Sequence, residues 1–251
     1  MRSLIASASI ALVALAAAPV LAQAPRPDSV TEVLRQKVVP GTTDKYEAGR
    51  KKHMAWHKAQ GDPWTWNVYE ITTGPDTGGY LIASPNHQWA DVDTWTAKYG
   101  DGDQADAAAS MAGTQASSQL SYWTQLNAIS RLPSADAAPS PLASLTIYSV
   151  KPGHDAALMA TVGKLNTALT AAKYPLHSIW YRLTSGGATP SYAVVTPRAN
   201  MASFGDAVMA AIEKQLGKAG SDALVKEFFD NITGVSTELL QRRADLSYAP
   251  N

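Results

Sequence analysis

Two histidines spaced four residues apart are the first side chains in this sequence that could do chemistry. They occur in the order His53-Met54-Ala55-Trp56-His57, in a stretch that contains no proline. In a helix this spacing places both imidazoles on one face, where a third ligand could complete a metal site. The Glu that follows the first His in a metalloprotease helix is absent, because Met54 occupies that position. We therefore keep His53 and His57 only as candidate catalytic residues, and we predict no metal and no cofactor.

The other histidines and the acidic residues form no recognisable catalytic motif. His87, His154 and His177 each stand alone near expected turns or strand ends. The sequence has no nucleophile elbow, no Ser-His-Asp order and no phosphate-binding loop before a helix. The acidic stretch 101–106 lacks the ligand spacing and the terminal Glu of an EF-hand loop, so we expect it to cap the start of a helix. Its three aspartates are Asp101, Asp103 and Asp106.

An internal repeat indicates how these residues are positioned. A shift of 112 positions places Pro40-Gly41 on Pro152-Gly153 without a gap. Self-similarity in register over some fifty residues predicts a duplicated structural unit. The same shift aligns His53 and His57 with leucines, so we expect both histidines between a helix and a sheet. Further aligned pairs are Tyr69 with Tyr181, Gly74 with Gly186, Tyr80 with Tyr192 and Pro85 with Pro197.

Each half is predicted to run strand, helix, strand, strand, helix. First strands end at the two Pro-Gly turns, and alanine- and lysine-rich helices follow at 43–60 and 155–172. Aromatic and β-branched second strands (65–72 and 178–184) lead through glycine-containing hairpins to third strands at 80–84 and 192–196. The remainder of each half is predicted to be helical. These helices are short at 90–99 and 202–217, and long at 104–131 and 221–244.

Alternation along the second strands sorts side chains onto two faces. One face carries Trp66, Glu70, Trp180 and Arg182, a mixture of indoles and charges that suits a ligand-binding interior. We name these four as candidate ligand-binding residues. The alternative is a filled interior in which Glu70 and Arg182 form a buried ion pair. The opposite face is nearly all apolar and suits the layer beneath the helices; it carries Asn67, Tyr69, Ile71, Ile179, Tyr181 and Leu183.

Two halves that open with a strand ending in Pro-Gly, and close a hairpin with Tyr-x-Ile/Val before a proline, resemble the dimeric α/β-barrel (ferredoxin-like) superfamily. The resemblance implies an α+β fold: two tandem ferredoxin-like β-α-β-β-α repeats forming a pseudo-dimeric barrel with helices outside. The implied domains are a signal peptide at 1–22, a first repeat at 31–132, a linker at 133–141 and a second repeat at 142–247. Superfamily members include monooxygenases and haem proteins. No motif here selects among them, and a fold alone does not determine function.

The N-terminal sequence predicts where the protein is located, and the composition limits which classes of partner it can bind. A basic start, an apolar run and small residues up to Ala22 predict a secretory signal peptide cleaved there, and hence a periplasmic or secreted protein. The absence of cysteine excludes disulfides and a lipidated cysteine. The 21 basic and 21 acidic residues cancel, so we expect neither nucleic acid nor, after cleavage, a membrane as partner.

Three functions remain open at this stage. We favour binding of a small, largely apolar ligand in the barrel. The alternative is a cofactor-independent monooxygenase-like or haem-associated oxidoreductase, in which His53 or His57 would take part. The third is a structural or assembly protein with a filled barrel, and a homo-oligomer is compatible with each of them.

Overall fold

The computed structural model describes residues 28–134, 137–205 and 207–250. The predicted signal peptide lies outside the described residues, as do two positions of the predicted linker. In the first half the elements are β1 (Ser29–Val38), α1 (Thr43–Gln60), β2 (Asn67–Ile71), β3 (Tyr80–His87), α2 (Trp89–Ser110) and β4 (Gln115–Gln125). In the second half they are β5 (Leu142–Val150), α3 (Asp155–Ala171), β6 (Ile179–Ser185), β7 (Ser191–Arg198), α4 (Val208–Asp230) and β8 (Ile232–Arg242). Short 3₁₀ turns lie at Asn127–Ile129, Met201–Gly205 and Ala244–Leu246.

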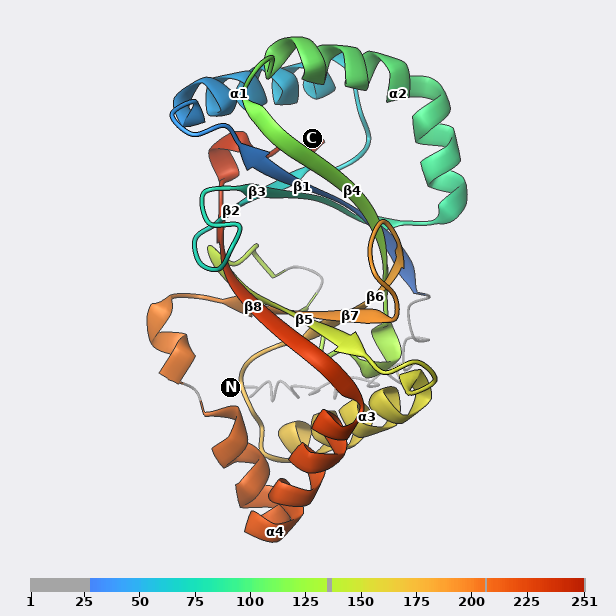
Figure 1. The fold of residues 1–251 in the computed structure, drawn as a ribbon, viewed down its shortest axis with the longest axis vertical. Helices are drawn as coiled ribbons and strands as arrows, with labels where there is room; N and C mark the ends of the chain where they lie inside the picture. Colours follow the sequence, from blue (N-terminus) through green and yellow to red (C-terminus); the bar gives the residue numbers. More distant parts are fainter. Residues whose placement is uncertain (1–27, 135–136, 206, 251) are drawn as a thin grey trace, which may run out of the picture.

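The eight strands close into one antiparallel barrel in the order β1-β3-β2-β8-β5-β7-β6-β4. Within each half the first strand lies between the third and the last. The halves meet at two seams, β2 with β8 and β4 with β6. Helices α1 and α2 cover one side of the barrel, and α3 and α4 cover the opposite side (Figure 1). Closure leaves no open sheet edge, and it encloses an interior shared by both halves.

The strands β4 and β8 are a correction to the predicted helices at 104–131 and 221–244. The helical part of each stretch ends at Ser110 or Asp230, and a full-length strand follows. Gly113, at a φ of +71°, turns the chain between α2 and β4. β4 then pairs with β1 along its whole length, which is a long-range interaction that local helix propensity does not reveal. Each half is therefore β-α-β-β-α-β.

The glycine-containing breaks also differ from the prediction in the first half. Helix α2 runs without interruption through Gly100 and Gly102, where the sequence suggested two helices. In the second half Gly217 does leave helical geometry, at a φ of +68°, and it kinks α4. The unbroken α2 matters because it places Asp103 and Asp106 in the middle of a helix, three residues apart and on one face.

Close packing brings α2 against α1. A Cβ atom on Gly49 of α1 would lie 2.2 Å from the backbone oxygen of Ser110 at the end of α2. Only glycine permits this approach of the two backbones. A mostly aromatic layer, called the aromatic layer below, fills the space between these helices and the sheet. Its buried members include Tyr46, Met54, Trp64, Trp66, Tyr80, Trp95, Tyr99 and Leu246.

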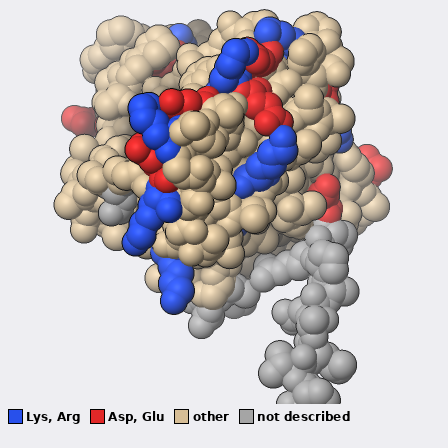
Figure 2. Space-filling model, turned by 90° about the horizontal axis from the view of Figure 1, so that it is seen from below, with Lys and Arg blue, Asp and Glu red and all other residues tan. Residues whose placement is uncertain are grey.

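The outer surface carries mixed charges. Figure 2 views the molecule from below, and positive and negative side chains are interspersed on that face. On α3 and α4 such side chains form ion pairs, for example Lys164 with Glu227 and Lys226 with Asp230. No helix within the described residues has the length and apolar character needed to cross a membrane.

Candidate functional site

The barrel encloses a cavity of about 330 Å³. This volume lies within the usual range for small-molecule sites. Both halves contribute to its wall, because repeat-related positions on corresponding strands face the same interior. Apolar and aromatic lining residues include Val33, Tyr69, Leu81, Trp123, Leu145, Ile147, Tyr181, Leu183, Ala193, Val195 and Leu240.

This wall also carries polar groups, and within the described part of the chain one of them is buried without a partner. The hydroxyl of Thr31 lines the cavity, is buried, and has no hydrogen-bond partner among the described residues. Tyr69 and Tyr181 also face the cavity, and burial raises the pKa of each phenol. No hydrogen bond of either phenol hydroxyl is found within the described part of the chain. A buried polar group without a partner costs free energy unless a ligand or water supplies one.

The interior charges, by contrast, are paired. Arg35 on β1 binds both carboxylate oxygens of Glu238, at 3.0 and 2.8 Å, and Asp76 at 3.1 Å. Lys37 adds a second contact to Asp76, and the two cations hold the pKa of that carboxyl below its usual range. The cavity therefore offers hydrogen-bonding groups but no unpaired charge from this cluster.

The predicted cavity residues of the first half lie on the other face of the sheet. Trp66 packs in the aromatic layer beneath α1 and α2. Glu70 contacts Arg243 at 3.3 Å, and that arginine also binds Glu47 of α1. The assignment of faces from alternation was therefore reversed. Tyr69 of β2, which we expected beneath the helices, lines the cavity inside the barrel.

The second half shows the same reversal. Trp180 packs with Phe228 of α4 and stacks on Tyr148, and Arg182 is exposed. Glu70 and Arg182 therefore do not form the predicted buried pair. The prediction failed because both faces of these strands are substantially apolar, so alternation separated two sets without indicating which one faced inward.

His53 and His57 are both buried, at 3% and 1% exposure; His57 packs on Trp66, which precedes β2, whereas His53 faces α2. Gly61, in the left-handed conformation, ends α1 and turns the chain so that Asp62 faces the last helical turn. His57 Nδ1 lies 2.7 Å from Asp62 Oδ2, and His53 Nδ1 lies 2.8 Å from Asp106 Oδ2 on α2. Each imidazole is thus held through Nδ1 by its own carboxylate.

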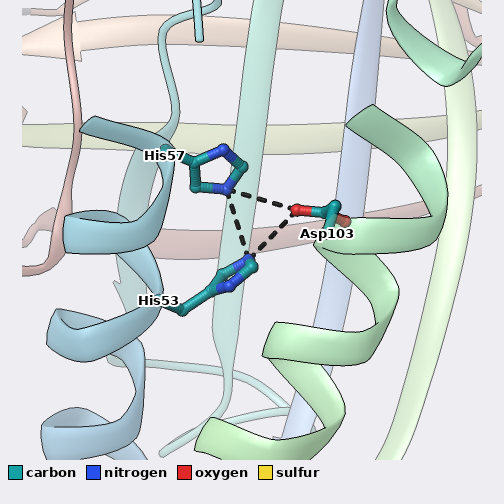
Figure 3. Close-up of side chains that lie close together, drawn as sticks. All are labelled: His53, His57 and Asp103. Atoms are coloured by element: carbon teal, nitrogen blue, oxygen red, sulfur yellow. Dashed lines mark hydrogen bonds and ion pairs between the residues drawn. The ribbon is translucent and has the colours of Figure 1, made fainter. Parts of the chain in front are cut away.

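The remaining ring nitrogens converge on a third carboxylate. The Nε2 atoms of His53 and His57 are 3.2 Å apart. Asp103 Oδ1 lies 3.2 Å from the first and 3.3 Å from the second. Figure 3 shows the three side chains pointing toward one another, two from successive turns of α1 and one from α2. Among the described residues, the ligand atoms of these three lie within 4.8 Å of one another, close enough to hold a metal ion.

Two more titratable groups lie in the same half. Burial raises the pKa of Glu32 on β1 to about 7; a hydrogen bond with Tyr122 opposes the shift, and the negative charge of Asp103 adds to it. His87 stacks on Trp64 and shares a 2.7 Å hydrogen bond with Ser84, and burial lowers its pKa. Neither group touches the two-histidine cluster directly.

Sequence reasoning missed several residues of these sites. Asp103 and Asp106 were interpreted as helix caps because the glycines around them suggested a break. Asp62 carried no signal, since its role depends on a turn after α1. Thr31, Tyr69 and Tyr181 were missed as lining residues. The alignment of Tyr69 with Tyr181 in the repeat was the one available pointer to them.

The comparisons with known proteins give likeness in structure only. No family model matches the sequence, and no curated protein matches it. A candidate monooxygenase from Lactobacillus acidophilus NCFM superposes with a TM-score of 0.56 at 9% identity, covering 90% of this chain and 98% of that one. An anthrone oxidase-like protein gives 0.53 at 15% identity, with 86% and 94% covered. Chlorite dismutase from Candidatus Nitrospira defluvii, in complex with imidazole, gives 0.51 at 10% identity, with 86% and 92% covered.

These neighbours are members of the dimeric α/β-barrel superfamily, so the predicted resemblance is confirmed at the level of the fold. At 9 to 15% identity the likeness extends to the fold and not to the activity.

Proposed function

We propose that this chain, which has the dimeric α/β-barrel fold, binds a small, uncharged and largely apolar molecule inside the barrel. One observation carries the proposal: the cavity of about 330 Å³ has a mostly apolar wall that also presents the buried hydroxyl of Thr31, which has no partner among the described residues. An apolar body would displace the enclosed water, and one hydrogen-bonding group would satisfy a hydroxyl of the wall. The pairing of Arg35 with Glu238 and Asp76 favours a neutral ligand over an anion.

The test is a fluorescence titration with N-phenyl-1-naphthylamine, a neutral apolar probe, against its anionic relative anilinonaphthalene sulfonate. We expect saturable binding of the neutral probe and weaker binding of the anion. Ala193 is buried on the cavity wall, so Ala193→Leu should fill part of the space and weaken the neutral probe about tenfold or more, equivalent to about 1.4 kcal/mol. Ala97→Leu, on the exposed face of α2, is the matched control. Equal binding by both variants would contradict the proposal.

A second candidate is cofactor-independent, monooxygenase-like oxidation of the bound molecule. The likeness to a candidate monooxygenase and to an anthrone oxidase-like protein favours it. With anthrone as substrate, one dioxygen would be consumed for each anthraquinone and water formed. An oxygen electrode and product absorbance measure both quantities, and consumption that Ala193→Leu does not change would place the reaction outside the cavity.

The likeness to chlorite dismutase raises the question of whether the cavity holds a haem. The residues that line it do not fit one. The described lining of the cavity includes no His, Met or Cys to serve as an axial ligand. Its tyrosines have raised pKa values, which disfavour the phenolate form that binds iron. His53 and His57 do not line the cavity, and each Nδ1 is held by a carboxylate beneath the helices. No haem step is assigned.

We propose in addition that the two halves arose by duplication of one unit and that the protein is exported. The equal order of elements in the two halves, together with the gap-free repeat, supports descent from one copied unit. The N-terminal sequence supports export, with Gln23 as first mature residue. Expression of the full chain in a bacterial host followed by N-terminal sequencing of the periplasmic fraction tests this. An intact Met1 terminus in the cytoplasm would contradict it.

A further inference from the structure

We propose that His53, His57 and Asp103 bind one divalent first-row transition-metal ion, Zn²⁺ fitting best, with a fourth coordination position left open. This site lies beneath α1 and α2, on the opposite face of the sheet from the cavity, so it is independent of the proposed ligand site.

The surroundings of Asp62 determine the tautomer of His57. Asp62 accepts hydrogen bonds from the indole N–H groups of Trp66 and Trp95, both at 2.8 Å, and from the backbone N–H of Trp64 at 2.9 Å. Both carboxylate oxygens of Asp62 thus accept hydrogen bonds from N–H donors, which is the role of an ionised carboxylate. An ionised carboxylate can only accept, so His57 donates from Nδ1. In the neutral ring Nε2 then carries a lone pair.

The same reasoning applies to His53. Its Nδ1 faces Asp106 Oδ2, which also accepts from the Ser110 hydroxyl at 3.3 Å. His53 therefore donates from Nδ1 and presents a lone pair at Nε2. A carboxylate that holds the far nitrogen of a histidine is the usual outer partner of a metal-binding imidazole, because it fixes the ring and raises its basicity.

Three potential electron-pair donors thus face one another: Nε2 of His53, Nε2 of His57 and Oδ1 of Asp103. The three separations of 3.2, 3.2 and 3.3 Å form a nearly equilateral triangle. Such a triangle is the face of a tetrahedron whose centre lies about 2.0 Å from each corner, which is the length of a Zn–N or Zn–O bond. Three protein ligands and one open position are the arrangement of catalytic rather than structural zinc sites.

Charge and donor type favour a transition metal over a harder ion. Asp62, Asp103 and Asp106 place three carboxylates around two imidazoles, and none of the three forms an ion pair with a Lys or Arg among the described residues. A divalent cation offsets much of this charge. Two imidazole nitrogens suit Zn²⁺ and its neighbours, whereas Ca²⁺ and Mg²⁺ prefer oxygen ligands.

The aromatic layer shields the cluster from water. Trp56 lies nearly parallel to the ring of His53 and edge-on to that of His57. Gly102 of α2 leaves room for it, because a Cβ there would lie 3.0 Å from the Trp56 ring. On the other side His57 stacks on Tyr248. The two imidazoles are therefore held in place and kept from water, whereas Asp103 stays partly exposed. Imidazoles that are already ordered lower the cost of ordering the site when an ion binds.

The experiment uses the full mature chain, stripped with a chelator and then titrated with Zn²⁺ and, separately, with Co²⁺. We expect one ion per chain by elemental analysis and the intense visible absorption of tetrahedral Co²⁺. His53→Ala and His57→Ala should each weaken binding by about 100-fold or more, beyond the range expected for loss of an outer partner. His177→Ala, an exposed histidine of the second half, should bind as the parent does.

Two further variants separate loss of the site from loss of the fold. Asp103 is partly exposed, so Asp103→Asn should keep the fold by circular dichroism while it weakens Zn²⁺ and shifts the Co²⁺ spectrum. Asp106 is not one of the three proposed ligands but holds His53 through Nδ1. Asp106→Asn should therefore weaken binding by about 10 to 100-fold, the range for loss of an outer partner. A folded parent protein that takes up no ion overturns the proposal. His53 and His57 would then be joined by a proton shared between their Nε2 atoms. Binding that survives in folded His53→Ala and Asp103→Asn overturns it equally.

Discussion

The imidazole of His57 donates its Nδ1 proton to Asp62 across 2.7 Å, and this bond ties the end of α1 to the aromatic layer above the sheet. Asp62 is 1% exposed and is reached by two indoles from different elements, so a single carboxylate joins α1, α2 and the start of β2. The pair therefore has a structural role whether or not an ion binds at the other side of the ring.

Asp62→Ala should lower the free energy of unfolding by roughly 3 kcal/mol or more. The change leaves the two indole N–H groups and the His57 Nδ1–H buried without acceptors, and each such group costs about 1–3 kcal/mol. Urea denaturation at pH 7 measures the loss. Asp93→Asn, on the exposed face of α2, is the control and should change little. A loss below about 1 kcal/mol would contradict the role assigned to Asp62.

Glu32 should make the stability fall as the pH rises. Its pKa in the folded protein is about 7 against 4.5 for the free side chain, so folding favours the protonated form. The stability that it contributes is fully present below pH 4.5 and is lost as the pH rises through 7. At about 1.4 kcal/mol for each pKa unit, the loss approaches 3 kcal/mol by pH 8.

Glu32→Gln removes this titration, so its stability should change less between pH 4.5 and pH 8. The comparison requires chelator in all samples and urea denaturation at each pH. Parallel curves for the parent and the variant would show that Glu32 does not titrate in this range.

Gly49→Ala should separate the helices that carry the metal site. The new Cβ would overlap the Ser110 oxygen, and α2 must move because the obstacle is backbone. We expect a loss of about 2–3 kcal/mol, of the order seen for overpacked cores, and weaker Zn²⁺ binding. Gly163→Ala on α3 is the matched control, since nothing lies within 4 Å of a Cβ there. That variant should gain about 0.5–1 kcal/mol, as expected for Gly→Ala within a helix.

Thr31→Val should affect the empty and the occupied cavity in opposite ways. Removal of a buried hydroxyl that has no partner should leave the ligand-free protein unchanged or about 1 kcal/mol more stable. Binding of a ligand that hydrogen-bonds to this hydroxyl should weaken. Thermal unfolding with and without N-phenyl-1-naphthylamine, beside the exposed control Thr96→Val, checks both effects. Destabilisation of the free protein by more than about 1 kcal/mol would show that the hydroxyl has a partner.

Much of the architecture followed from the chain by itself. The gap-free repeat and the Pro-Gly turns predicted the first strand, the first helix and the central hairpin of each half, because those signals are local. The same repeat placed His53 and His57 between helix and sheet, since their counterparts are leucines of a buried stripe. The structure agrees on these elements and buries both histidines, with His53 facing α2.

Tertiary contacts decided the rest. β4 and β8 exist because they pair with distant strands and close the barrel, and closure in turn decides which side of β2 and β6 faces the cavity. Asp62, Asp103 and Asp106 reach the histidines only because Gly49 lets α2 lie against α1 and Gly61 reverses the chain. Local propensity is a property of neighbours in sequence, whereas a cavity wall and a cluster of three ligand atoms are properties of neighbours in space.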